Sequence, residues 1–260
     1  MNFGYLPDPK DDRDFRASVA LSIKEVKEMP LYVNLSSYDF PIRDQKGLGC
    51  CVSMACTNLR YALLKKQVEA LAGDTDLPLL SVLYHYYRCR EIMGTIERDS
   101  GTYIRTGMKA LADWGCAPEK YMPYMPEKFR EAPIEWMDWA AGNLKIYTYN
   151  RLETFEEMRQ SIAQGFPVIL AVKVFDNMHG GLVPETIPDG IWKLPEDNNS
   201  LIGWHAIVIA GYTTAFKVPG GGWFYVVNSW GKDWGKSGCA WMPYKFILDG
   251  HWQDAWMGIA

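Results

Sequence analysis

The chain has no apolar run long enough to span a lipid bilayer. A transmembrane helix needs about 18 or more consecutive apolar residues, whereas the strongest candidate, residues 166–175, is ten residues long and is interrupted by Lys173. The first residues also lack the basic patch and apolar core of a secretory signal. We therefore expect no membrane partner and a cytoplasmic location.

Charge and cysteine are too sparse to indicate several other classes of protein. The 27 basic and 31 acidic residues give a net charge of −4, which is too small to predict nucleic-acid binding. Six cysteines among 260 residues are too few for a disulfide scaffold, and no C-x-x-C pair or other metal-ligand spacing is present. We expect free thiols, no metal and no cofactor.

The chain changes character near its middle. At 260 residues, 48% of them hydrophobic, it can bury a sizeable core in one domain or two lobes. The proline-rich residues 118–133 are expected to bridge the two halves. Apolar periodicity predicts helices at residues 51–66, 81–93, 104–114 and 154–164, and β-branched or aromatic runs predict strands at 167–175, 205–212, 223–228 and 239–243. The expected fold class is α+β.

Three residue types needed for thiol nucleophilic catalysis occur in order along the chain. Cys51 begins a helical pattern, His205 begins an apolar strand, and Asn228 follows the next strand. A thiolate attacks a carbonyl carbon, and its pKa falls at a helix N-terminus and beside an imidazolium. Cys50 adjoins Cys51 as a competing nucleophile, and either cysteine could instead be a small buried hydrophobe.

The longest of these signals is the string NSWGKDWG at residues 228–235. Together with Gln45, the paired cysteines and the His-Ala-apolar-Gly-Tyr pattern that begins at His205, it resembles the papain-like cysteine peptidases of family C1, whose order is Gln, Cys, His, Asn. The separation of 154 residues between Cys51 and His205 is near the roughly 130–150 residues expected of that family.

The resemblance implies a role for each residue. Gln45 lies six residues before Cys51, as in the family, and this register favours Cys51 over Cys50 as the nucleophile. His205 would act as general acid and base, Asn228 would orient the imidazole, and Gln45 would donate to the oxyanion. Peptide bonds would be cleaved through a thioester acyl-enzyme on Cys51.

The resemblance also implies a papain-like, two-lobed architecture with the active cleft between the lobes. The expected peptidase domain, residues 31–260, has a helical lobe at about 41–130 and an antiparallel β-barrel-like lobe at about 135–250. Residues 1–30 resemble the short leader of propeptide-lacking bacterial, archaeal and viral-type members. This leader either lies along the cleft and restricts access to it, or packs on the body without that effect.

Five further residues are expected to bind a peptide or protein substrate. The segment of residues 100–102 resembles the one whose backbone pairs with an extended substrate in these peptidases. Trp230 resembles the family tryptophan that covers the hydrogen bond between histidine and asparagine. The expected substrate-binding residues are Gly49, Gly101, Thr102, Trp230 and Trp234.

Two alternative functions use the same residues. Replacing water by another acceptor would make the chain a transpeptidase, because the acyl-enzyme is common to hydrolysis and transfer. A catalytically inactive peptide-binding protein on the same fold is the second alternative, since fold does not fix function. The intact set of Gln45, Cys51, His205 and Asn228 argues against lost catalysis. A monomer is the default expectation.

Overall fold

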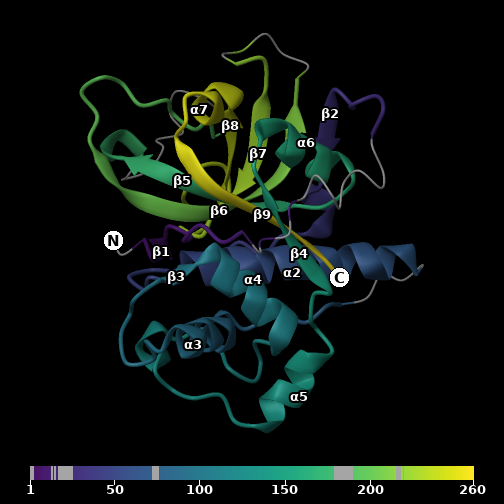
Figure 1. The fold of residues 1–260 in the computed structure, drawn as a ribbon, viewed down its shortest axis with the longest axis vertical. Coiled ribbons are helices and arrows are strands. Elements are labelled where there is room, and N and C mark those ends of the chain that lie inside the picture. The colour runs from purple at the N-terminus through teal and green to yellow at the C-terminus, as the bar shows by residue number, and fades with distance from the viewer. Residues whose placement is uncertain are drawn as a thin grey trace.

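The computed structural model describes residues 3–12, 14, 16, 26–71, 76–178, 190–214, 218 and 220–260. They form a helical half and a β half that lie against each other, with the N-terminal segment between them (Figure 1). The α+β class and the two-lobed arrangement are therefore confirmed.

The helical half is organised around one long helix. Helix α2 (Cys51–Ala70) passes through the middle of the molecule, packs against the sheet, and is buried from Cys51 to Leu63. Helices α3 (Val82–Met93) and α4 (Ile104–Asp113) pack on it, close to their expected positions. The side-chain oxygen of Ser81 caps α3 by accepting a hydrogen bond from the backbone N–H of Tyr84.

A short helix that the sequence did not predict extends this half. Helix α5 (Trp136–Gly142) follows the proline-rich segment. Its Asp138 accepts a hydrogen bond from the Tyr84 hydroxyl at 2.6 Å and pairs with Arg88, both on α3. Helix α5 is therefore joined to α3 of the helical half.

The β half is a seven-stranded sheet with the order β4-β9-β5-β6-β7-β8, in which β2 also pairs with β6. All of its strand pairs are antiparallel. The four expected strands are confirmed, and β2, β4 and β9 are additional. The strands are β2 (Tyr32–Asn34), β4 (Thr148–Leu152), β5 (Val168–Phe175), β6 (Leu201–Thr213), β7 (Trp223–Val227), β8 (Cys239–Pro243) and β9 (Trp252–Ile259).

Two helices flank the sheet. Helix α6 (Phe155–Ala163) begins with the expected capping box, in which the side chains of Thr154 and Glu157 each accept a backbone N–H of the other residue. Helix α7 (Tyr244–Leu248) joins β8 to β9. Single 3-10 turns lie at η2 (Ser36–Tyr38), η3 (Pro126–Lys128) and η4 (Asp176–Met178).

The described part of the leader runs between the two halves. Strand β1 (Tyr5–Leu6) pairs in parallel with β3 (Thr102–Tyr103), which immediately precedes α4. Residues 1, 2, 13, 15 and 17–25 of the expected leader lie outside the described residues.

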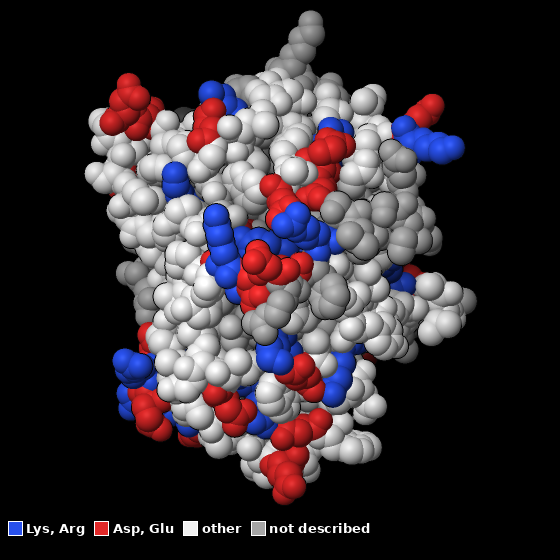
Figure 2. Space-filling view, viewed as in Figure 1, with Lys and Arg blue, Asp and Glu red and all other residues white. Residues whose placement is uncertain are grey.

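The molecular surface agrees with the mild charge of the sequence. Acidic and basic side chains are interspersed over the face drawn in Figure 2, and neither sign forms an extended patch there. Within the described ranges, no helix combines the length and apolar character needed to cross a membrane. All six cysteines are described, and each is a buried free thiol, as expected.

Candidate active site

Cys51 is the first residue of α2, and Cys50 is its N-cap. The partial positive charge of a helix N-terminus favours a thiolate at this position. The helix packs against β6, where the backbone N–H of Ala206 contacts the Cys51 thiol. Because Ala206 follows His205 directly, this contact places the expected nucleophile beside the strand that carries the expected base.

His205 and Asn228 form a hydrogen bond that fixes the imidazole. His205 Nε2 lies 2.7 Å from Asn228 Oδ1, which also accepts the backbone N–H of Ser229 at 2.8 Å. An amide oxygen that accepts this bond requires the proton on Nε2, so Nδ1 is left as the basic nitrogen. Among the described residues, the buried Nδ1 has no hydrogen-bond partner, as a nitrogen reserved for a thiol proton would require.

Trp230 covers this pair. Its indole stacks on the His205 ring at a centroid distance of 4.6 Å and an interplanar angle of 26°. Trp234 lies behind Trp230 and meets it edge-on, with the two ring centroids 5.6 Å apart. Trp234 is only 5% exposed. The two indoles exclude water from the bond between His205 and Asn228, and this strengthens it.

Burial keeps the thiol and the imidazole uncharged. Both Cys51 and His205 are 0% exposed. Burial raises the pKa of Cys51 to about 12, opposed first by the N–H of Ala206. Burial lowers the pKa of His205 to about 4, opposed by its hydrogen bond with Asn228. Both shifts favour the uncharged pair, so entry of solvent or substrate would favour the reactive thiolate–imidazolium pair.

Cys50 faces a different environment from its neighbour. Its Sγ lies 3.3 Å from the hydroxyl of Tyr124, which donates to the carbonyl oxygen of Gln45 at 2.8 Å. Burial raises the pKa of Cys50 as well. The Cys50 thiol is therefore linked to Gln45 through Tyr124, whereas the Cys51 thiol contacts the strand of the histidine.

Gln45 is held by a residue that sequence reasoning did not select. Ser229 Oγ donates to Gln45 Oε1 at 2.8 Å, and the Gln45 backbone N–H donates to the Ser229 carbonyl at 2.9 Å. With its oxygen engaged, the Gln45 amide directs Nε2 away from Ser229, to the Leu48 carbonyl at 3.1 Å. The position of Ser229 directly after Asn228 was the available signal.

The leader lies in front of these residues, in the space between Gly49 and Gly101, which is here called the groove. An added Cβ at Gly4 would lie 2.0 Å from the Gly49 carbonyl oxygen, and one at Gly101 would lie 2.2 Å from the Gly4 carbonyl oxygen. The backbone N–H of Thr102 donates to the same Gly4 oxygen at 2.8 Å. The leader backbone therefore passes between Gly49 and Gly101 so closely that position 4 has room only for a glycine.

Phe3 lies next to the catalytic histidine candidate. Its ring centroid is 6.2 Å from that of His205 and 6.3 Å from that of Trp230. A Cβ at Gly203 would lie 2.3 Å from Phe3 Cδ2, so the absence of a side chain there makes room for the ring. Of the five residues expected to bind substrate, four contact the leader, and Trp234 lies behind Trp230.

Comparison with known proteins assigns the family. The model of the papain family cysteine proteases matches residues 36–247. The chain belongs to the papain family of cysteine proteases. An uncharacterised peptidase C1-like protein of Acanthamoeba polyphaga mimivirus is 30% identical over 274 residues, which cover 95% of this protease and 83% of the viral protein.

Solved structures extend the likeness over the whole protease. Xylellain, a cysteine protease from Xylella fastidiosa, is similar with a TM-score of 0.81 and 27% identity, covering 100% of this chain and 96% of that one. Digestive procathepsin L2 proteinase of Tenebrio molitor larval midgut has a TM-score of 0.71 at 18% identity, covering 100% of this chain and 78% of that one. The latter likeness supports the fold alone.

The two walls of the protease groove are connected by hydrogen bonds. The backbone N–H of Gly49 donates to both Asp99 oxygens, at 3.1 and 3.0 Å, and the Tyr86 hydroxyl donates to Asp99 Oδ1 at 2.6 Å. The same hydroxyl accepts the backbone N–H of Gly101 at 3.0 Å. This chain of bonds joins the Gly49 wall to the Gly101 wall and fixes the width of the groove.

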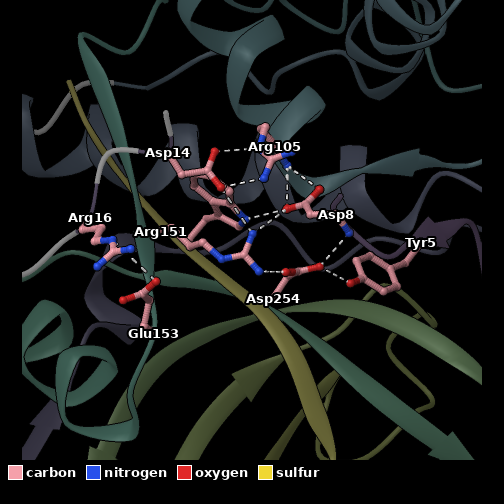
Figure 3. Close-up of polar contacts among 9 residues, drawn as sticks. Tyr5, Asp8, Asp14, Arg16, Arg105, Arg151, Glu153 and Asp254 are labelled. Carbon is pink, nitrogen blue, oxygen red and sulfur yellow. Dashed lines mark hydrogen bonds and ion pairs between the residues drawn. The ribbon is translucent and has the colours of Figure 1, made fainter. Parts of the chain in front are cut away.

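A cluster of charged side chains, here called the leader clamp, holds the leader beyond the groove. It consists of Asp8 and Asp14 from the leader, Arg105 from α4, Arg151 from β4 and Asp254 from β9 (Figure 3). Arg105 donates to Asp14 from Nε at 2.7 Å and from Nη2 at 2.6 Å. Arg151 pairs with Asp254, and its Nη1 lies 3.5 Å from Asp14 and 3.8 Å from Asp8.

Asp8 also caps a helix of the protease body. Its carboxylate accepts the backbone N–H of Arg105 at 3.2 and 3.3 Å and the indole N–H of Trp256 at 2.8 Å. The N-cap residue of α4, Tyr103, supplies no side-chain hydrogen bond. A carboxylate near a helix N-terminus is stabilising, so release of the leader leaves α4 without this cap.

Proposed function

We propose that this protease hydrolyses peptide bonds through a thioester on Cys51. His205 Nδ1 takes the thiol proton as Sγ attacks the carbonyl carbon, and the resulting imidazolium gives the proton to the leaving amine. Water then adds to the thioester and loses a proton to His205, and the carboxylic acid and free thiol are released. The single observation that carries the proposal is the hydrogen-bonded and covered pair of His205 and Asn228 beside Cys51.

Two donors are proposed to stabilise the oxyanion. The backbone N–H of Cys51 has no acceptor within the helix, because it belongs to the first turn of α2. The side-chain amide of Gln45 is oriented by Ser229. A single donor of this kind is worth about 2.7–4 kcal/mol in acyl transfer where it has been measured.

The leader is proposed to be a gate over this site. Its backbone fills the space between Gly49 and Gly101, and Phe3 lies against the ring of Trp230. The complete burial of Cys51 and His205 supports the gating interpretation over simple packing on the body. Substrate and leader would compete for one groove, so hydrolysis requires the leader to move.

Protonation of Asp8 gives the gate a pH dependence. Burial, and then the Asp254 carboxylate, raise the pKa of Asp8 to about 7, against the lowering effects of Trp256, the Arg105 backbone and the Arg105 guanidinium. A carboxyl on a released, solvated leader has its ordinary pKa of ~3.9. The closed state therefore binds this proton more tightly than the open state.

The sign of the dependence follows from this difference. Closure is strengthened as the pH falls from about 7 toward ~4, and it weakens as the pH rises through about 7. The other titratable and charged groups that face Asp8 are Asp254, Arg151, Arg105 and Asp14, together with Tyr5. Burial and the hydrogen bond to Asp254 raise the pKa of Tyr5, so its phenol remains neutral over this range.

The substrate class follows from the family, and the location is part of the proposal. Papain-family membership implies peptide or protein substrates. Six buried free thiols are compatible with the reducing cytosol, where we place the protease.

Hydrolysis of a fluorogenic peptide library by the full-length protein tests the catalytic proposal. Cys51→Ala is expected to abolish turnover while leaving the fold intact, because the thiol is the nucleophile. Cys50→Ala is the matched control, since it removes the adjacent buried thiol, and it is expected to retain most activity. Undiminished turnover in Cys51→Ala would refute the assignment.

A further inference from the structure

A tight turn precedes the two adjacent cysteines and carries the proposed oxyanion donor. The backbone N–H of Leu48 donates to the Gln45 carbonyl oxygen at 3.2 Å and closes the turn. Its second residue, Lys46, has φ of +53°, in the left-handed region that is unfavourable for a residue with a side chain. Such a conformation persists only where its surroundings hold it, so the position of Gln45 depends on contacts outside the turn.

Tyr124 supplies one of these contacts from the helical half. Its hydroxyl donates to the Gln45 carbonyl oxygen at 2.8 Å, across 79 positions of sequence. A carbonyl oxygen has two lone pairs, and here the N–H of Leu48 and the hydroxyl of Tyr124 use both. On its other side, Gln45 donates its backbone N–H to the Ser229 carbonyl in the β half. The backbone of Gln45 is therefore fixed from both halves of the molecule.

The segment that carries Tyr124 is itself firmly attached. Ser81 Oγ, at the N-cap of α3, donates to the Met122 carbonyl at 2.6 Å. Glu119 pairs with Arg43, which lies just before the turn. A hydrogen-bonding group on a rigid support fixes its partner more precisely than one on a free loop. Tyr124 thus connects the turn to the framework of the helical half.

The single proton of the Tyr124 hydroxyl is committed to Gln45. The hydroxyl oxygen therefore accepts from the Cys50 thiol, whose Sγ lies 3.3 Å away. Burial raises the pKa of Cys50, opposed first by Tyr124, and burial also raises the pKa of Tyr124. Both groups keep their protons at neutral pH, so no thiolate at position 50 draws the hydroxyl proton away from Gln45.

From this geometry we propose that Tyr124 is a positioning residue for the reaction, which acts through Gln45 and holds its amide where the oxyanion forms. Because Gln45 is an oxyanion donor only in the proposed function, this role rests on that function. Among the described residues, the polar partners of the Tyr124 hydroxyl are Gln45 and Cys50. Loss of the hydroxyl should therefore weaken stabilisation of the transition state and leave substrate binding unchanged.

Peptide hydrolysis by full-length Gly4→Val protein, with and without Tyr124→Phe, tests this role. Tyr124→Phe is expected to lower kcat by about fivefold to tenfold and to change KM by less than about twofold. Alkylation of Cys51 by iodoacetamide, a displacement that forms no oxyanion, should change by less than about twofold. Tyr121→Phe is the matched control, because Tyr121 lies in the same segment and its hydroxyl makes no hydrogen bond to the described residues.

A double-mutant comparison separates positioning from general support of the fold. In the Gln45→Ala background the amide is absent, so adding Tyr124→Phe should lower kcat by less than about twofold further. A residue that only stabilised the fold would retain its full effect there. An undiminished effect in the Gln45→Ala background, or an unchanged kcat when Gln45 is present, would overturn the role of Tyr124 and leave the peptidase standing.

The Gln45 carbonyl can also be observed without turnover. Gln45 and Lys46 form the only Gln–Lys pair in the sequence, so labelling glutamine with ¹³C at the carbonyl and lysine with ¹⁵N isolates its resonance in an HNCO spectrum. Tyr124→Phe should move this resonance upfield, because the carbonyl loses a hydrogen bond, and an unchanged resonance would overturn the inference. A shifted resonance without turnover in any of these proteins would overturn the peptidase and support the contact that holds Gln45.

Discussion

Replacing Gly4 by valine should open the active site of this protease. Gly4 has φ of +74°, and a Cβ there would lie 2.0 Å from the carbonyl oxygen and 2.6 Å from the Cα of Gly49. Ordinary van der Waals contact begins at 3.4 Å. Both neighbouring atoms are backbone, so the leader strand itself must move by more than 1 Å.

The size of the effect follows from what the leader loses. A non-glycine residue in the left-handed region costs about 1–2 kcal/mol. Displacement also removes the hydrogen bond from Thr102 to Gly4, worth about 0.5–1.5 kcal/mol, and the contact of Phe3 with His205 and Trp230, worth a similar amount. A total of about 3 kcal/mol shifts the equilibrium toward the open state by roughly 100-fold.

The rate at which iodoacetamide alkylates Cys51 in the full-length protein reports the open fraction. Gly4→Val is expected to raise this rate by about 100-fold over wild type, up to the limit set by a fully open site. Gly250→Val is the matched control, because Gly250 has φ of +76° and nothing within 4 Å of an added Cβ, so it tests backbone strain alone. Equal rates for wild type and Gly4→Val would refute the gate.

Three other perturbations should have separable effects. The alkylation rate of wild type relative to Asp8→Asn, which mimics the protonated carboxyl at every pH, should fall on the order of 100-fold between pH 8 and pH 4, because Asp8 binds a proton more tightly in the closed state; a ratio that does not change with pH would contradict the assignment to Asp8. Asn228→Ala should lower kcat by about tenfold or more while Cys51 can still be alkylated, because Asn228 orients the imidazole and does not bond to substrate. Tyr86→Phe in the Gly4→Val background should raise KM for peptides severalfold with little change in alkylation, because it frees Gly101 from Asp99; an effect on alkylation alone would contradict a role in groove width.

The catalytic residues could be selected from the sequence because their signal is local. Asn228 and Trp230 stand together in one string, and Gln45 lies at a fixed spacing from Cys51. The structure places these residues together with His205 where the segment of Gln45 meets the segment of Asn228, at the backbone hydrogen bond between Gln45 and Ser229. Their chemical roles remain predictions for the assays above.

The elements that were missed lack such local signals. Strand β9 carries the polar pair Gln253 and Asp254 ahead of an apolar run, and β4 carries Arg151, so neither has clean alternation of apolar and polar residues. Helix α5 has only seven residues and begins shortly after Pro133, too short for periodicity to detect.

The leader clamp could not be predicted for a related reason. Asp8 and Asp254 are 246 positions apart, and each carboxylate read alone indicates a solvated side chain. Only the fold reveals that they share one buried site with Arg151 between the halves of the molecule. The sequence could therefore place a leader over the cleft as one of two alternatives, but it could not identify the contacts that hold it there.

Active-site labelling tests the central claim most directly. Full-length wild type and Gly4→Val are treated with a peptidyl epoxide, which alkylates an activated thiol in a peptide-binding groove, and the adduct is located by intact mass and peptide mapping. The account predicts one adduct per chain, on Cys51, formed much faster in Gly4→Val. An adduct on Cys50, or folded Gly4→Val protein that remains unlabelled, would contradict it.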